Sequence, residues 1–155
     1  MAQQRTRYEQ RSILDALETY LGTEGYTGFT FSDGYQPEAE ISPPHVTVHF
    51  PPSSPRELQL GRVQGQESLY RRSVVVNAYM ENQGRADAIV DLVIDFLDLT
   101  CITVKDHEDN VLGTLQCYNT DGIVGQTFAP IMGNPKNIRW RGSVTAPMES
   151  YYPNS

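Results

Sequence analysis

Two histidines are the residues in this sequence whose type and spacing first suggest chemistry. His45 and His49 flank a segment in which Val46 and Val48 alternate with polar residues, a pattern that predicts a half-buried β-strand. Four residues of a strand span about 13 Å at 3.3 Å per residue, which is too far for both histidines to bind one metal ion. We therefore expect two partly exposed strand histidines and no metal site.

Other catalytic patterns are incomplete. Two-histidine phosphoesterases carry two copies of a His-x-Thr-x motif, and the residues from His45 to Val48 match one copy. The second copy is missing, because His107 is followed by Glu108 and Asp109. Asp106 and its acidic neighbours lack the spacing of an EF-hand loop and predict the polar tip of a hairpin. No serine lies in a G-x-S-x-G motif, and no Walker or dinucleotide-binding glycine pattern occurs. We expect no catalytic residues, no enzyme activity and no cofactor.

The elements that would position these residues follow from hydrophobic spacing. Apolar residues recur at helical spacing over residues 8–21 and 85–99, whereas strands are predicted at 45–50, 69–80, 101–105, 111–118 and 138–145. The strand at 69–80 is apolar on both faces, which places it centrally in the sheet. Residues 29–37 predict at most one short strand. The order predicts one α+β domain over residues 1–155, with a mostly antiparallel sheet of about five to six strands flanked by two helices.

Two segments are predicted to extend from this domain. Residues 51–67 begin with prolines and lie between two strands of one sheet, so we prefer a long hairpin arm to a disordered linker. Residues 147–155 predict a C-terminal tail whose two tyrosines either fold back onto the body or dock on a partner. The candidate partner-contacting residues of the arm and tail are Arg56, Arg62, Tyr151 and Tyr152.

The helix at 85–99 has more apolar surface than a small domain needs. Its aspartates cluster within about 80° of the helical wheel, and apolar residues fill nearly all of the remaining 240° or so, whereas a surface helix usually needs an apolar stripe of about 100°. Either the helix lies in the middle of the domain, or one flank packs on the sheet and the other on a neighbouring copy; we prefer the second. The candidate subunit-interface residues are Ile89, Val90, Val93, Ile94 and Leu97, and the aspartates left in water, facing a partner or a channel, are Asp87, Asp91, Asp95 and Asp98.

Composition disfavours binding to nucleic acid or membranes. The net charge is −7, and an acidic chain does not hold a phosphate backbone by bulk attraction. Trp140, between Arg139 and Arg141, is therefore interpreted as a core residue rather than a stacking platform. No apolar run approaches the roughly 20 residues of a membrane span.

The stretch from Tyr70 to Tyr79 (YRRSVVVNAY), followed by that from Gly84 to Val93 (GRADAIVDLV), resembles the tail terminator, or tail completion, proteins of tailed bacteriophages. The resemblance implies a structural virion protein of the tail and neck region, assembled in the host cytoplasm. It also implies a hexameric ring that caps the tail tube and joins it to the head–neck connector, with tail tube and connector proteins as partners and DNA passing without specific binding.

Three alternatives stay open. Another phage neck, connector or minor tail protein would use the same kinds of surface. A small cytoplasmic enzyme would use His45, His49 and Asp106, and a monomeric binding module would use the 51–67 segment for recognition.

Overall fold

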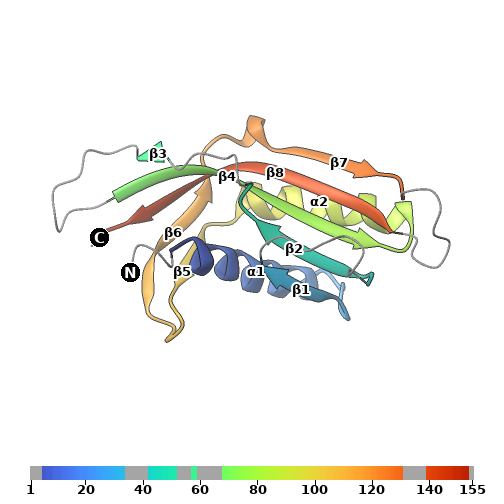
Figure 1. The fold of residues 1–155 in the computed structure, drawn as a ribbon, viewed down its shortest axis with the longest axis horizontal. Coiled ribbons are helices and arrows are strands. Elements are labelled where there is room, and N and C mark those ends of the chain that lie inside the picture. Colours follow the sequence, from blue (N-terminus) through green and yellow to red (C-terminus); the bar gives the residue numbers. More distant parts are fainter. Residues whose placement is uncertain (1–4, 34–41, 52–56, 59–67, 131–138, 154–155) are drawn as a thin grey trace.

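The chain forms two α-helices and a curled sheet. The computed structural model describes residues 5–33, 42–51, 57–58, 68–130 and 139–153. The elements are α1 (Arg5–Thr23), β1 (Thr30–Asp33), β2 (His45–His49), β3 (Glu57–Leu58), β4 (Ser68–Met80), α2 (Gln83–Leu99), β5 (Ile102–Lys105), β6 (Val111–Cys117), a short 3₁₀ turn (Thr120–Gly122), β7 (Val124–Phe128) and β8 (Trp140–Tyr152). Figure 1 shows the sheet bending over both helices. The predicted α+β class is confirmed.

Six strands form the continuous order β1-β2-β4-β8-β6-β5, and outside this path β3 pairs with β4 and β7 pairs with β8. The β1–β2 pair is parallel and the other pairs are antiparallel. β4 and β8 pair along their full length, from Ser68 opposite Tyr152 to Met80 opposite Trp140, so the predicted central position of β4 is confirmed. The sheet has more strands than the five to six predicted. The additional strands are β7 and the two-residue β3, neither of which was predicted from the sequence.

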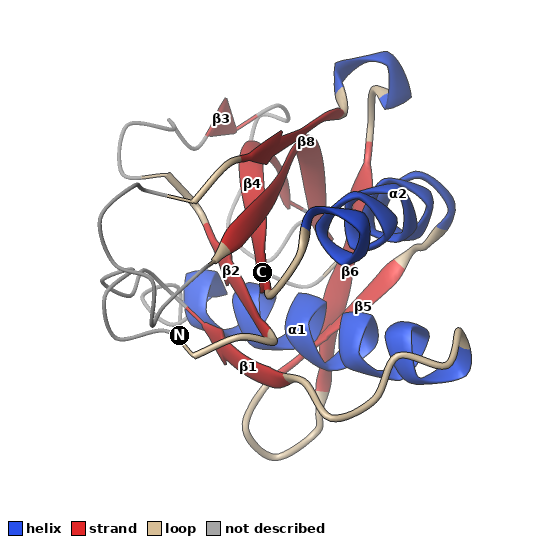
Figure 2. Cartoon of the chain, turned by 90° about the vertical axis from the view of Figure 1, so that its right-hand side faces the viewer, coloured by secondary structure: helices blue, strands red, loops and turns tan. Residues whose placement is uncertain are grey.

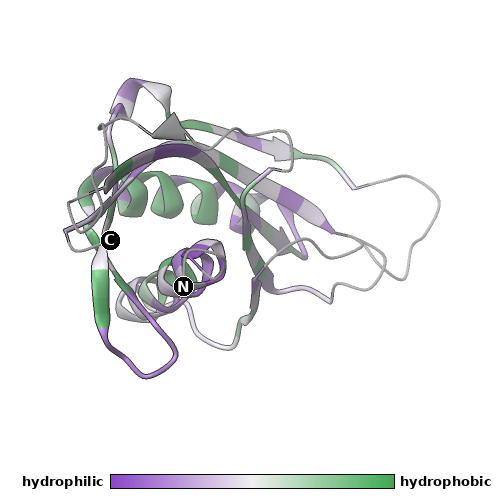
Figure 3. Cartoon of the chain, turned by 60° about the vertical axis from the view of Figure 1, so that its left-hand side comes forward, coloured by the Kyte–Doolittle hydropathy of each residue, from purple (hydrophilic) through white to green (hydrophobic). Residues whose placement is uncertain are grey.

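One face of the sheet, called the inner face here, packs against both helices (Figure 2). Side chains alternate between faces along a strand, and every second residue of β8 from Gly142 to Tyr152 is buried. Figure 3 shows the apolar helix α2 lying along the sheet, whereas α1 combines polar and apolar residues. The most completely buried large side chains include Ile13, Leu17 and Leu21 of α1 and Ile89, Phe96 and Leu97 of α2. Removing this apolar area from water, at about 25 cal/mol per Å², is what holds the layers together.

Polar side chains fix the N-terminal end of α2 and the tip of the β5–β6 hairpin. Asn82 caps α2, because its Oδ1 accepts a hydrogen bond from the Arg85 amide at 2.8 Å. At the hairpin tip, Asp106 Oδ1 accepts from the amides of Asn110 and Glu108, each at 2.9 Å. These bonds, that from Asn110 foremost, hold the pKa of the Asp106 carboxyl below its usual range. The predicted polar hairpin tip is confirmed.

The two predicted extensions fare differently. Residues 147–152 are not a tail: they are the end of β8, paired with both β4 and β6. The arm at 51–67 lies mostly outside the described residues, and within it β3 pairs with Arg71 and Tyr70 of β4.

In the described part of the chain, neither helix combines the length and apolar character needed to cross a membrane.

Candidate functional site

The apolar α2 residues predicted to contact a neighbouring subunit lie inside the domain. Ile89, Val90, Val93 and Leu97 are buried in the core, and Ile94 is half-buried against it. α2 packs on β4 and β8 and is flanked by β7 and α1. The prediction of a subunit interface at the four buried residues is therefore wrong, and the alternative of a helix in the middle of the domain is the correct one.

Strand β7 explains this correction, because it covers the second flank of α2. A Cβ atom on Gly125 would lie 2.7 Å from Val90 Cγ1 and 2.8 Å from Ile94 Cδ1, so glycine lets the strand approach the helix this closely. The available signal was the short alternation from Val124 to Phe128, which is too polar to stand out by hydrophobic pattern.

The acidic stripe of α2, defined as Asp87, Asp91, Asp95 and Asp98, is exposed, which confirms that these residues lie in water. Asp87 Oδ1 accepts a hydrogen bond from Thr127 Oγ1 of β7, so the stripe begins beside that strand. Within the described residues, no ion pair involves Asp91 or Asp95. Of the other candidate partner contacts, Arg56 and Arg62 lie outside the described residues.

The two tyrosines at the end of β8 point to opposite faces of the sheet. Tyr152 lies on the inner face and is buried, whereas Tyr151 is half-buried on the opposite face. Tyr152 is thus not available for docking on a partner, because the strand that contains it continues past Pro147 into the core. Of the pair, only Tyr151 remains a candidate contact.

Sequence reasoning missed a buried polar cluster that joins α1 to β8. The Glu9 carboxylate accepts hydrogen bonds from the Tyr152 hydroxyl and from Ser150 Oγ, the latter at 3.2 Å, and the Arg5 guanidinium lies 4.3 Å from the centre of the Tyr152 ring. Burial and the Glu9 carboxylate raise the pKa of Tyr152 well above its usual value, which keeps its hydroxyl protonated. The adjoining space of about 10 Å³ holds at most one water molecule, so we interpret the cluster as structural.

His45 is buried, which corrects the expectation that it is partly exposed. Its Nδ1 contacts Thr30 Oγ1 of β1, and its Nε2 contacts Ser32 Oγ of the same strand at 2.8 Å. Burial lowers the pKa of His45 and of the half-buried His49. Both ring nitrogens of His45 therefore hold β1 against β2. Among the residues that the structure describes, no group of three or more His, Cys, Asp or Glu is placed to hold a metal ion.

A polar groove of about 350 Å³ lies between α1 and β5. The Tyr8 hydroxyl bonds His107 Nδ1 at 3.1 Å on one side, and the Lys105 amide donates to Ser12 Oγ at 3.1 Å across the seam. Its exposed lining includes charges of both signs, such as Arg11 and Lys105 with Asp15 and Asp109. This mixture does not favour one class of ligand.

The sheet face turned away from the helices, called the outer face here, carries a different set of side chains. Three of the five large apolar side chains that are exposed in the described chain lie here: Tyr118, Val124 (54% exposed) and Phe128 (37%). Together with their polar neighbours on β4, β7 and β8 they form what we call the outer surface. Its residues are Arg71, Tyr118, Val124, Gln126, Phe128, Arg141, Ser143, Thr145 and Glu149.

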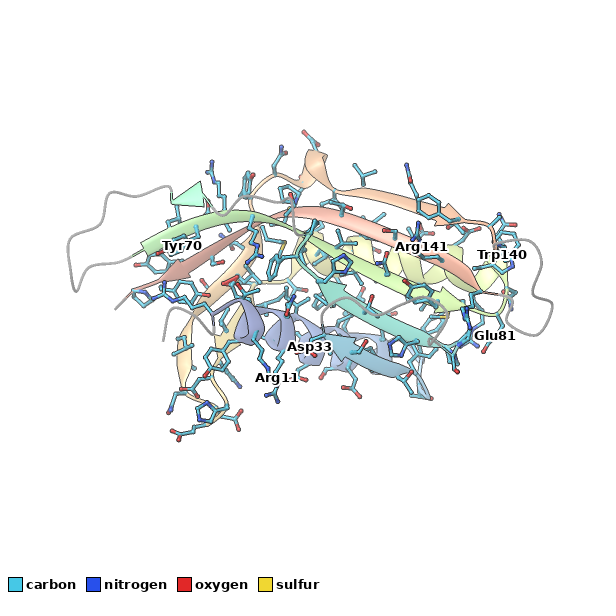
Figure 4. The ribbon with its side chains drawn as sticks, viewed as in Figure 1. Arg11, Asp33, Tyr70, Glu81, Trp140 and Arg141 are labelled. Atoms are coloured by element: carbon cyan, nitrogen blue, oxygen red, sulfur yellow. The ribbon has the colours of Figure 1, made fainter. Side chains whose placement is uncertain are left out.

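Two arginines on the outer surface stack on aromatic rings. Arg141 lies 4.3 Å from the centre of the Phe128 ring, its direct cross-strand partner, and Figure 4 shows Arg141 beside β7. Arg71 lies 4.3 Å from the Tyr118 ring and pairs with Glu149 at 3.0 Å. Arginine and aromatic residues are enriched at protein interfaces. Trp140, by contrast, packs against the core as predicted.

The structure therefore defines the class of the domain: an α+β domain in which exposed apolar side chains and two stacked arginines gather on the sheet face that the helices do not cover. No protein-family model matches the chain, and the curated proteins searched include no match to it.

Proposed function

We propose that the protein is a structural subunit, six copies of which assemble head to tail into a closed ring. We propose further that this ring is the tail terminator of a tailed bacteriophage. In this role the ring caps the tail tube and joins it to the head–neck connector. The subunit is assembled in the host cytoplasm, becomes part of the virion, and acts without a catalytic step or a cofactor. DNA passes through the ring without specific binding.

The outer surface is the observation that carries the assembly part of this proposal. It combines exposed apolar side chains with two stacked arginines on a sheet face that the helices do not cover. Within the described strands, β7 also pairs with β8 alone and so keeps one open edge. Open edges and arginine–aromatic surfaces invite contact with another chain.

The terminator part rests on the resemblance of residues 70–93 to tail terminator proteins, in which a long strand leads directly into a helix. Here that segment comprises most of β4, the Asn82 cap and the first part of α2. The net charge of −7 supports a ring through which DNA moves without adhering.

Light scattering coupled to size-exclusion chromatography, followed by negative-stain electron microscopy, tests the proposal. We expect hexameric rings, and rings at the ends of tubes when tail tube protein is added. A strictly monomeric species at high micromolar concentration, even with tube protein present, would contradict the ring. Dodecamers would favour a head-to-tail connector instead, which is the competing assembly role.

A further inference from the structure

We infer that the outer surface of one copy receives the α2 helix of the next copy, with Arg141 facing that helix's acidic stripe. This inference rests on the proposed ring and specifies the contact that closes it. The partner is a second copy of this chain, and the argument for it is complementary charge on two surfaces of one molecule.

Arg141 is the charged group that the outer surface leaves unmatched. Arg71 is paired with Glu149, whereas the described residues offer Arg141 neither an ion pair nor an acceptor for its enclosed Nε. Its guanidinium is fixed in place by the stack on Phe128, so little side-chain freedom is lost when a carboxylate binds. The exposed Val124 and Phe128 beside it add apolar area to the same contact.

The acidic stripe supplies the matching carboxylates. Asp87, Asp91 and Asp95 recur every fourth residue, so successive members lie on one side of α2, about 6 Å apart along its axis. They are exposed, and like charges at this spacing destabilise a helix slightly. A guanidinium from another copy removes that repulsion and forms a charge-assisted hydrogen bond with the carboxylates.

The two surfaces face different directions on one subunit. The buried residues of α2 point to the inner face of the sheet, and the stripe lies on the opposite side of the helix, while the outer surface points away from both helices (Figure 2). One copy therefore does not pair its own stripe with its own Arg141. Contact between two different surfaces is head-to-tail and continues until a ring closes.

Charge reversal on each surface tests this contact. The stripe variant is Asp91→Arg combined with Asp95→Arg, and the surface variant is Arg141→Asp. Each variant alone places like charges across the contact, so we expect its concentration for half-assembly to rise at least about tenfold. An equimolar mixture should assemble again, because each reversed surface then meets its complement. The matched controls, Arg11→Asp and Asp15→Arg on the exposed side of α1, should assemble like the natural chain.

Scattering mass and electron microscopy of each sample, with a thermal melt to verify folding, separate the outcomes. Failure of the natural chain to form any ring overturns the proposed function and this inference together. Rings of the natural chain that persist in either reversed variant at the same concentration overturn the inference alone. Loss of assembly in both variants without recovery in the mixture also overturns it, since the two surfaces would then not contact each other.

Discussion

The inner and outer faces of this sheet are made by alternate residues of the same strands, yet their chemistry differs. In β8 the inward residues include Val144, Ala146 and Met148, all buried, whereas the outward residues include Arg141, Thr145 and Glu149, all half-buried. The inner face is covered by the two helices of the same chain. The outer face carries exposed apolar side chains beside half-buried charged ones. The comparison teaches that apolar content alone does not locate an interface, because the apolar side of α2, the more apolar of the two helices, is buried inside the domain.

The largest expected effect comes from placing the same side chain on each face. Leu97→Arg puts an unpaired charge in the core, where Leu97 is fully buried, and should cost about 4 kcal/mol or more. Since a domain's total stability is about 5–15 kcal/mol, the variant should melt at a much lower temperature than the natural chain or lose its cooperative thermal transition. Circular dichroism during heating measures this.

The matched change on the outer face is Val124→Arg. Val124 is more than half exposed, so the melting temperature should stay close to that of the natural chain. A Leu97→Arg protein that melts like the natural chain would contradict the assignment of α2 to the core.

The next effect concerns the contact between β7 and α2. Gly125→Ala adds a methyl group against Val90 and Ile94, at 2.7 and 2.8 Å before any adjustment, and such overpacking costs about 1–3 kcal/mol. Urea unfolding followed by tryptophan fluorescence measures the loss. Gln126→Ala, at the adjacent outward position, should change stability by less than about 0.5 kcal/mol. Equal losses in both variants would mean that β7 does not rest on the helix.

The same unfolding assay compares the two tyrosines of β8. Tyr152→Phe removes a buried hydroxyl that donates to Glu9, leaving that carboxylate short of one donor at a cost of about 1–3 kcal/mol. Tyr151→Phe alters a half-buried side chain on the outer face and should cost less than Tyr152→Phe. A larger loss for Tyr151→Phe would reverse the assignment of faces.

How much the sequence predicted depends on whether a segment's pattern is long and regular. The segment from Tyr70 to Leu99 was placed correctly as a central strand and a helix, because its periodicity runs over many residues. The exposure of the aspartates on α2 followed from the same periodicity. What covers the apolar flanks of α2 did not follow, since that depends on β7, which is distant in sequence and short.

Pro147 shows why β8 was predicted to end too early. A proline usually ends a strand because it has no amide donor. Along this edge of β8, however, pairing with β7 reaches only Thr145 and pairing with β6 begins at Met148. Pro147 lies in the gap between those ladders, so its missing donor breaks no hydrogen bond there. Arg141 and Phe128 were likewise not predicted as neighbours, because cross-strand register is not visible in one sequence.

The smallest expected effect is a pH dependence that arises at the β1 side of the sheet. Burial lowers the pKa of His45 and of His49 in the folded chain, whereas in the unfolded chain both titrate near 6.5. Between the two values the unfolded chain binds more protons, so the free energy of unfolding rises with pH. The full contribution is present above about pH 6.5, and it is lost as the pH falls through the folded-state pKa values.

Urea midpoints at a series of pH values from about 7.5 to 5 should therefore fall, and they should fall less steeply in His45→Gln and in His49→Gln. His107→Gln, on the exposed hairpin tip, controls for the loss of a histidine. A slope unchanged by both strand substitutions would show that His45 and His49 do not couple folding to pH.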